Sequence, residues 1–192
     1  MTDRRVGAII LAGGRSSRFG RDKLAEPIDG RPLLDHAIDA VRPFAHEIIV
    51  VVAPDTAPGL TDDVTLVHDP IAFEGPLAGL ATGLGASNEP VVLVIGGDMP
   101  SIVVAVIDSM VEALDASVDA VVLEQDGRAR PLPIVLRRDP ALKAATDLYA
   151  GGERRLRALM EHLTAHVIPE STWRLLDPDG LTLHDIDTPA DL

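Results

Sequence analysis

An apolar run that ends at two adjacent glycines is the feature that most limits how this chain can fold. The run from Val6 to Ala12 is short and rich in β-branched residues, so it predicts a buried strand. Gly13 and Gly14 follow it directly, and glycine lets the backbone adopt positive φ and approach a ligand closely. A loop of this kind after a first strand is where an open α/β sheet binds its ligand.

The loop that begins at these glycines also carries cations. Arg18 and Lys23 add fixed positive charge to a stretch rich in backbone N–H groups, a combination that suits a polyphosphate. Neither common phosphate-binding pattern is present: the two glycines are adjacent rather than spaced, and Arg21 stands where a Walker loop needs lysine after Gly20. A glycine-rich turn with solvated arginines is the alternative interpretation.

Apolar runs alternate with segments of helical periodicity along the rest of the chain. We expect further strands at 47–52, 64–67, 91–95, 120–124, 132–136 and 165–168, and helices near 33–41, 75–87, 101–116, 140–150 and 153–163. Continuously apolar strands that alternate with helices favour a mostly parallel sheet covered on both faces. The sequence therefore predicts an α/β protein, a three-layer α/β/α sandwich that forms one domain over residues 1–192.

Composition excludes several classes of protein. The formal net charge of −13 disfavours binding to nucleic acid. No stretch approaches the roughly 20 apolar residues that a membrane span needs, and the polar first residues do not resemble a signal peptide. The absence of cysteine excludes disulfides and thiolate zinc sites. We therefore expect a cytoplasmic protein that contacts neither membrane nor nucleic acid.

The cations of this acidic chain fall into two clusters. One lies between residues 4 and 42 and the other between 128 and 157, with Arg174 alone beyond them, and no Lys or Arg occurs between Arg42 and Arg128. Two basic clusters in an acidic protein indicate anionic ligands bound at two places. For several of these arginines, simple solvation at the surface is the alternative.

Asp98 is the strongest candidate for a metal ligand. It follows the most apolar predicted strand and stands between Gly97 and Met99. A carboxylate at the carboxyl end of a strand faces the same crevice as the glycine loop. Mg²⁺ prefers such oxygen ligands and takes its other ligands from water and substrate phosphates. The alternative is that Asp98 caps the next helix, although Ser101 can do so instead.

Several segments resemble one enzyme family. Residues 11–23 resemble the Leu-Ala-Gly-Gly-x-Ser-x-Arg-Met-Gly-x-x-Lys signature of nucleotidyltransferases, with Phe19 in place of Met. The Gly-Gly form is most similar to the molybdenum cofactor guanylyltransferases, and so are Gly-Pro-Leu-Ala-Gly at 75–79 and Gly-Glu-Arg-Arg at 152–155. The resemblance extends from residue 6 to residue 192. It implies a Rossmann-like sheet of the nucleotide-diphospho-sugar transferase type.

The resemblance also implies a reaction: Mg²⁺-dependent transfer of GMP from GTP to the terminal phosphate of molybdopterin. The catalytic residues it implies are Arg18, Lys23 and Asp98, and the metal ligands are Asp98 and Asp187. Arg154 and Arg155 would hold the second substrate. Transient contact with cofactor-inserting proteins or molybdoenzymes is also expected. The nucleotide contacts it implies are Leu11, Ala12, Gly13, Gly14, Lys23, Asp69, Gly79 and Asp98.

Two positions depart from the family pattern. Ala53 stands where the family has Asn after its second strand, so that contact is lost or replaced. Asp187 stands where guanylyltransferases often carry Asn and relatives that use CTP carry Asp; alternatively, Asp187 or Thr188 caps a last turn.

Three other functions therefore stay open. One is a molybdopterin cytidylyltransferase. Another is a sugar- or polyol-phosphate nucleotidyltransferase, which the short chain disfavours. The last is a nucleotide-binding regulatory subunit without catalysis, which Lys23 and Asp98 disfavour.

Overall fold

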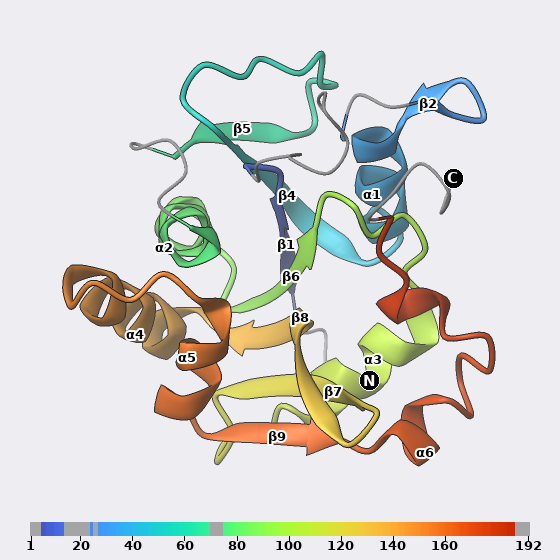
Figure 1. The fold of residues 1–192 in the computed structure, drawn as a ribbon, viewed down its shortest axis with the longest axis vertical. Helices are drawn as coiled ribbons and strands as arrows, with labels where there is room; N and C mark the ends of the chain where they lie inside the picture. The colour runs from blue at the N-terminus through green and yellow to red at the C-terminus, as the bar shows by residue number, and fades with distance from the viewer. Residues whose placement is uncertain (1–4, 14–23, 25–26, 70–74, 187–192) are drawn as a thin grey trace.

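A seven-stranded sheet lies between two layers of helices in the computed structural model, which describes residues 5–13, 24, 27–69 and 75–186 (Figure 1). A separate hairpin pairs β2 (Pro27–Ile28) with β3 (Arg31–Pro32). The strands of the main sheet are β1 (Val6–Leu11), β4 (Ala45–Val52), β5 (Thr65–His68), β6 (Val91–Gly96), β7 (Ala120–Gln125), β8 (Arg128–Arg137) and β9 (Ala165–Ile168).

The strand order creates a crevice between β1 and β6. The sheet runs β5-β4-β1-β6-β8-β7-β9, and every neighbouring pair is parallel except the two pairs that include β8. The chain moves outward from β1 to β4 and β5 and then returns to the other side of β1 as β6. Ligands bind at such a switch in strand order, at the carboxyl ends of the strands. The predicted mostly parallel α/β architecture is confirmed.

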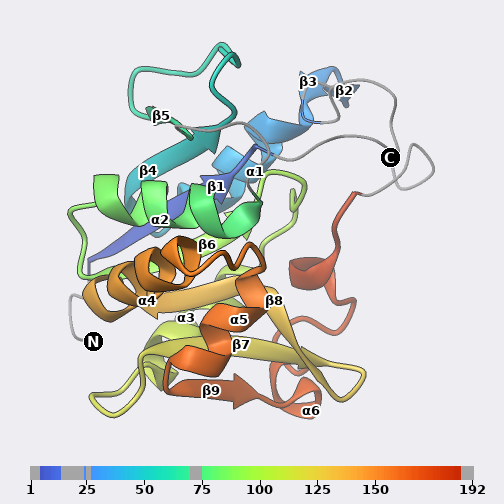
Figure 2. The same ribbon diagram turned by 60° about the vertical axis from the view of Figure 1, so that its left-hand side comes forward.

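Helices cover both faces of the sheet (Figures 1 and 2). The strands of the sheet are apolar on both faces because both faces are covered. In β1, Ile10 packs into the core beneath one helix layer, and the neighbouring Ile9 packs into the core beneath the other. The first layer contains α1 (Leu33–Val41) and α3 (Val104–Ala113). The second contains α2 (Pro76–Ala86), α4 (Arg138–Ala150) and α5 (Leu156–His162).

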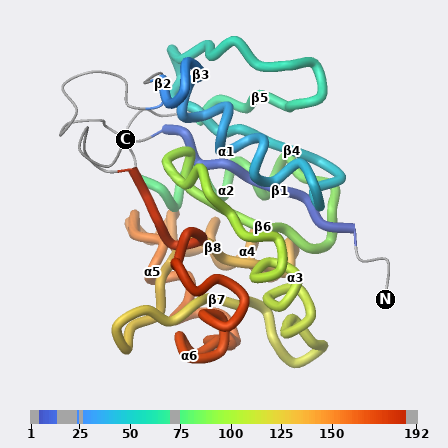
Figure 3. Tube along the Cα trace, turned by 90° about the vertical axis from the view of Figure 1, so that its right-hand side faces the viewer, coloured from blue at the N-terminus to red at the C-terminus, as the bar shows by residue number. Residues whose placement is uncertain are grey.

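The segment after β9 contains α6 (Glu170–Trp173) and the short helix η2 (Leu181–Leu183). Figure 3 shows this segment, in red, running from α6 along the side of the sheet past β7 and β8. The buried Trp173 donates its indole Nε1–H to the Glu124 carbonyl over 2.8 Å. At the end of the described segment, Ile186 donates its backbone N–H to the Asp98 carbonyl over 2.9 Å. The C-terminal segment therefore reaches the carboxyl end of β6.

The same segment contacts the residue that precedes α3, and the start of this helix corrects one prediction. The helix begins at Val104 rather than at residue 101, and Ser101 does not cap it. Thr182 accepts the Val103 N–H on its hydroxyl oxygen over 3.2 Å, and its own N–H donates to the Asp177 carboxylate over 2.8 Å. Burial alone would raise the pKa of Asp177, but these backbone and hydroxyl hydrogen bonds hold that pKa below its ordinary value. Because Thr182 is 79 residues away from Val103 in sequence, no local pattern could predict this contact. None of the helices in the described ranges is long and apolar enough to cross a bilayer.

Candidate functional site

The carboxyl ends of β1 and β6 meet at the crevice where the sequence places the ligand. The Gly97 N–H donates to the Leu11 carbonyl over 3.0 Å, which joins the turn after β6 to the last residue of β1. On the other side of β1, the N–H of the buried Ala12 donates to the Val51 carbonyl over 2.8 Å. The glycine loop, beginning at Gly13, and the Gly-Gly-Asp turn therefore start from adjacent, hydrogen-bonded strands.

Asp98 is held against the end of its own strand. Its Oδ1 atom occupies the space that a Cβ on Gly96 would fill, so a side chain at that position would displace the carboxylate. The side chain is half-buried, and the backbone carbonyl accepts the hydrogen bond from Ile186. The carboxylate thus lies at the crevice, while the main chain of Asp98 anchors the C-terminal segment.

Leu11, Asp69 and Gly79, three of the residues expected to contact the nucleotide, come together beside this crevice. A Cβ on Gly79 of α2 would lie 3.7 Å from the Asp69 Oδ2 and 3.7 Å from the Leu11 Cδ2. Asp69 follows β5 and is fixed by its backbone N–H, which donates to the Val52 carbonyl over 2.8 Å. Three segments that are distant in sequence therefore form one wall.

Ala53 lies beside the first loop glycine, as expected for the residue after β4. A Cβ on Gly13 would be 3.6 Å from the Ala53 backbone N atom. The methyl side chain provides no polar group here, so the amide that the family pattern expects has no counterpart at this position. A cavity of about 470 Å³ next to it is lined by Ala12, Leu24, Val52 and the loop at 55–59.

The Gly-Glu-Arg-Arg turn supports the start of α2. Leu77 donates its backbone N–H to the Arg154 carbonyl over 3.3 Å. Gly75 has φ of +92°, and a Cβ there would lie 2.9 Å from both the Cβ and the carbonyl oxygen of Arg154. The Arg154 guanidinium lies over the Tyr149 ring, 4.4 Å from its centroid, and donates to the Tyr149 and Glu153 carbonyls over 3.1 and 2.9 Å. The turn expected to hold the second substrate thus also positions the helix that carries Gly79.

Glu153 organises this turn. Its carboxylate accepts the backbone N–H groups of Arg154 and Arg155 over 2.8 and 3.0 Å and forms an ion pair with the exposed Arg155 side chain at 2.8 Å. The Arg155 guanidinium and the two N–H groups hold the pKa of Glu153 well below its ordinary range. These residues form a turn outside the helix, so α5 begins at Leu156 rather than at 153 as predicted.

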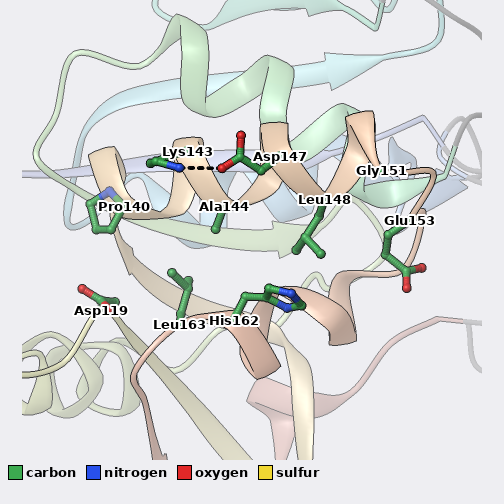
Figure 4. Close-up of a pocket in the computed structure, with 10 residues that line it drawn as sticks. All are labelled: Asp119, Pro140, Lys143, Ala144, Asp147, Leu148, Gly151, Glu153, His162 and Leu163. Atoms are coloured by element: carbon green, nitrogen blue, oxygen red, sulfur yellow. Dashed lines mark hydrogen bonds and ion pairs between the residues drawn. The ribbon is translucent and has the colours of Figure 1, made fainter.

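A groove lies between α4 and α5, below this turn (Figure 4). It has a volume of about 530 Å³ and an apolar floor that includes Ala144 and Leu163. Lys143 and Asp147 face each other along its α4 side and form an ion pair at 2.6 Å. Asp119 accepts the Thr164 N–H over 3.2 Å. Lys143, Asp147 and Asp119 therefore already have partners within the protein.

Four expected site residues, Gly14, Arg18, Lys23 and Asp187, lie outside the described residues. Within the described ranges, no three His, Asp or Glu side chains gather closely enough to hold a metal ion. The sequence analysis missed the Arg154 carbonyl and the Thr182 hydroxyl, because both act through contacts between distant segments.

The comparisons with known proteins agree with this geometry. A family model described as the MobA-like NTP transferase domain matches residues 8–167. A protein from Chloroflexus aggregans, named as a probable molybdenum cofactor guanylyltransferase, is 34% identical over 97% of this chain and 91% of its own length. A molybdenum cofactor guanylyltransferase from Desulfosudis oleivorans is 30% identical over 97% of this chain and 92% of its own.

A solved structure shares the fold. The molybdopterin-guanine dinucleotide biosynthesis protein A from Archaeoglobus fulgidus superposes with a TM-score of 0.79, at 20% identity, over 96% of this chain and 94% of its own. At that identity the likeness bears on the fold alone, and it confirms the predicted transferase type of sheet.

Proposed function

We propose a specific reaction for this chain, which belongs to the family of MobA-like NTP transferases and is a nucleotidyltransferase. It transfers GMP from GTP to the terminal phosphate of molybdopterin, giving the guanine dinucleotide form of the cofactor. An oxygen of the acceptor phosphate forms a bond to the α-phosphorus, and the bond from that phosphorus to pyrophosphate breaks. Such an acceptor is ionised at neutral pH, so no protein base is required.

The convergence of Leu11, Asp69 and Gly79 carries this proposal. Together they form a wall next to the glycine loop, where the nucleoside part of GTP would lie with its phosphates along residues 13–23. The name shared by the two curated relatives supports guanine as the base. Asp187 favours CTP instead, which makes the cytidylyltransferase the second candidate.

Asp98 suits magnesium by the chemistry of its donor. It presents a hard oxygen ligand at the crevice, and no described cluster of acids surrounds it, so water and substrate phosphates would complete the shell. The ion, when bound, would neutralise charge on the phosphate oxygens. We propose Asp187 as a second ligand, because its neighbour Ile186 is hydrogen-bonded to the Asp98 carbonyl.

The remaining roles concern charge and position. Arg18 and Lys23 stabilise the charge that develops on the triphosphate, and Arg154 and Arg155 hold the acceptor on its pterin side. Catalysis then consists of positioning and electrostatic stabilisation. We place the enzyme in the cytoplasm, in transient contact with proteins that receive the cofactor.

A comparison of nucleotides by thermal shift tests which base the enzyme uses. We expect GTP with Mg²⁺ to raise the melting temperature more than CTP, ATP or UTP does. Incubation of the protein with GTP, Mg²⁺ and molybdopterin should then release pyrophosphate, and omission of molybdopterin is the control. A larger shift with CTP, and pyrophosphate release from CTP only, would replace the guanylyl assignment with the cytidylyl one.

A further inference from the structure

Strand β8 extends beyond the end of its neighbour β6. The two strands are antiparallel and pair from Val91 with Arg137 to Val94 with Ile134. Residues of β8 that precede Ile134 therefore continue past the paired region, toward the carboxyl end of β6. Figure 2 shows the β7–β8 hairpin projecting on the side where the C-terminal segment also runs. The first half of β8 thus reaches the edge at which Asp98 stands.

Arg130 lies beside an irregular part of the β7–β8 pairing. Ala129 is opposite Glu124 and packs against the core beneath α2, α4 and α5, and the register then shifts before Ile134 pairs with Val122. Arg130 is therefore the first residue of a bulged stretch of β8. Helix η2 of the C-terminal segment contacts β8, and the segment then continues to Ile186 and its hydrogen bond with Asp98.

Arg130 stands apart from the other arginines in the described ranges. It is partly buried, its Nε is fully enclosed without a hydrogen-bond partner, and no described residue forms an ion pair with it. The other partly buried arginines are satisfied: Arg137 donates to the Val118 and Asp115 carbonyls, and Arg138 donates to the Ser87 carbonyl and pairs with Asp139. An enclosed donor without a partner costs stability, which points to a partner outside the protein chain.

The hairpin that carries Arg130 is held firmly. Trp173 donates to the Glu124 carbonyl over 2.8 Å, and Asp126 donates its N–H to the Glu170 carboxylate over 2.9 Å. Glu170 also pairs with Arg174 at 3.2 Å. Helix α6 therefore holds the end of β7 and the turn that leads into the strand of Arg130.

We propose that Arg130 binds the phosphate of the acceptor substrate, a phosphomonoester; this rests on the proposed function. Two strand spacings of about 4.8 Å separate β8 from β1, so Arg130 lies across β6 from the wall of Leu11, Asp69 and Gly79. The acceptor and the nucleotide then approach Asp98 from opposite flanks. The planar guanidinium matches two phosphate oxygens at once, which lysine does not reproduce.

Arg130→Met tests this role with two readouts. Because the substitution removes an enclosed N–H donor without a partner and keeps an apolar stem, the melting temperature of the ligand-free protein should stay equal or rise. The KM for molybdopterin should rise at least tenfold while the KM for GTP changes less than twofold, and Arg130→Lys should restore part of the loss. Arg128→Met, two residues away on the same strand and exposed, is the matched control and should change neither KM.

Three results would overturn the assignment: an unchanged KM for molybdopterin, an equal rise in both KM values, or a fall of several degrees in melting temperature. Inorganic phosphate separates this proposal from the reaction itself. Phosphate should raise the melting temperature of the wild type more than that of Arg130→Met, and loop cations contribute equally to both. If the two shifts are equal, Arg130 is not an anion site even where transfer occurs. If the two shifts differ but no GMP transfer occurs, the proposed reaction is wrong, and Arg130 is still an anion-binding residue.

Discussion

The two halves of the sheet build their parts of the site in different ways. Around β1, β4 and β5, the site is built on backbone without side chains: Gly13 and Gly79 leave open surface that a ligand can approach closely, and a Cβ on either would meet its nearest neighbour at 3.6 Å. Around β7, β8 and β9, cations are abundant, but most of them are bound to carbonyls or carboxylates of the protein itself.

The difference shows what a cluster of cations in a sequence can mean. Arg137, Arg138 and Arg174 hold loops and helix ends together, and Arg154 holds the start of α2. Only the partners in the folded protein distinguish such structural arginines from one kept for a ligand. A glycine can be less ambiguous: a Cβ on Gly83 would lie 2.8 Å from the Ile9 Cγ2, whatever the ligand is.

Asp98→Asn should produce the largest effect and leaves the first half otherwise intact. We expect kcat to fall about a hundredfold or more, which corresponds to about 3 kcal/mol of transition-state stabilisation. The fold should persist, because the Asp98 backbone carbonyl still accepts the Ile186 N–H. Steady-state transfer rates measure kcat, and thermal melting measures the stability of the fold. Asp108→Asn, on the exposed face of α3, is the control. Full activity at ordinary Mg²⁺ would remove Asp98 from the chemistry.

Lys23→Ala should lower kcat and kcat/KM together, by about a hundredfold, because its charge acts on the departing pyrophosphate. A lysine that only tethers the ground-state triphosphate would raise the KM for GTP and leave kcat unchanged. Lys23→Arg should recover only part of the rate. Lys143→Ala provides the matched control, because this exposed lysine pairs with Asp147 on α4.

Gly83→Ala should destabilise the first half through packing alone. The added Cβ would lie 2.8 Å from the Ile9 Cγ2 and 3.0 Å from the Val51 Cγ2, and overpacking of this kind costs about 1–3 kcal/mol. This exceeds the gain of up to about 1 kcal/mol in helix propensity. Gly85→Ala on the same helix meets nothing within 4 Å and should be neutral or stabilising. Urea unfolding of the two variants compares them, and equal stabilities would mean that α2 does not pack closely on β1 and β4.

Glu153→Gln should produce the smallest effect and act in the second half. Since the folded protein lowers the pKa of Glu153, its stabilisation is present above the ordinary value of 4.5 and declines as pH falls below it. The difference in melting temperature between wild type and variant should therefore be constant from pH 7 to about 4.5 and shrink toward pH 3. Glu112→Gln, exposed on α3, is the control. An undiminished difference at pH 3 would show that the Glu153 charge does not hold the turn.

Much of this architecture could be predicted because its causes are local. The apolar runs that became β1, β4, β6 and β9 fix the strands, and Asp98 follows its strand as expected. The start of α3 could not be predicted, because the residue before it is bound by Thr182 rather than capped by the nearby Ser101. The enclosed Nε of Arg130 likewise depends on segments that meet only in the folded chain.

The affinity of Gly79→Ala for GTP tests the central claim most directly. The new Cβ would have only ordinary contacts, the nearest at 3.6 Å from the Val51 Cγ1, so the fold accepts it and the helix gains up to about 1 kcal/mol in propensity. If Gly79 lies against the nucleotide, calorimetry should show GTP affinity falling at least about tenfold, or about 1.4 kcal/mol, in a protein that melts no lower than the wild type. Unchanged GTP affinity in that variant would contradict a nucleotide site built on Leu11, Asp69 and Gly79.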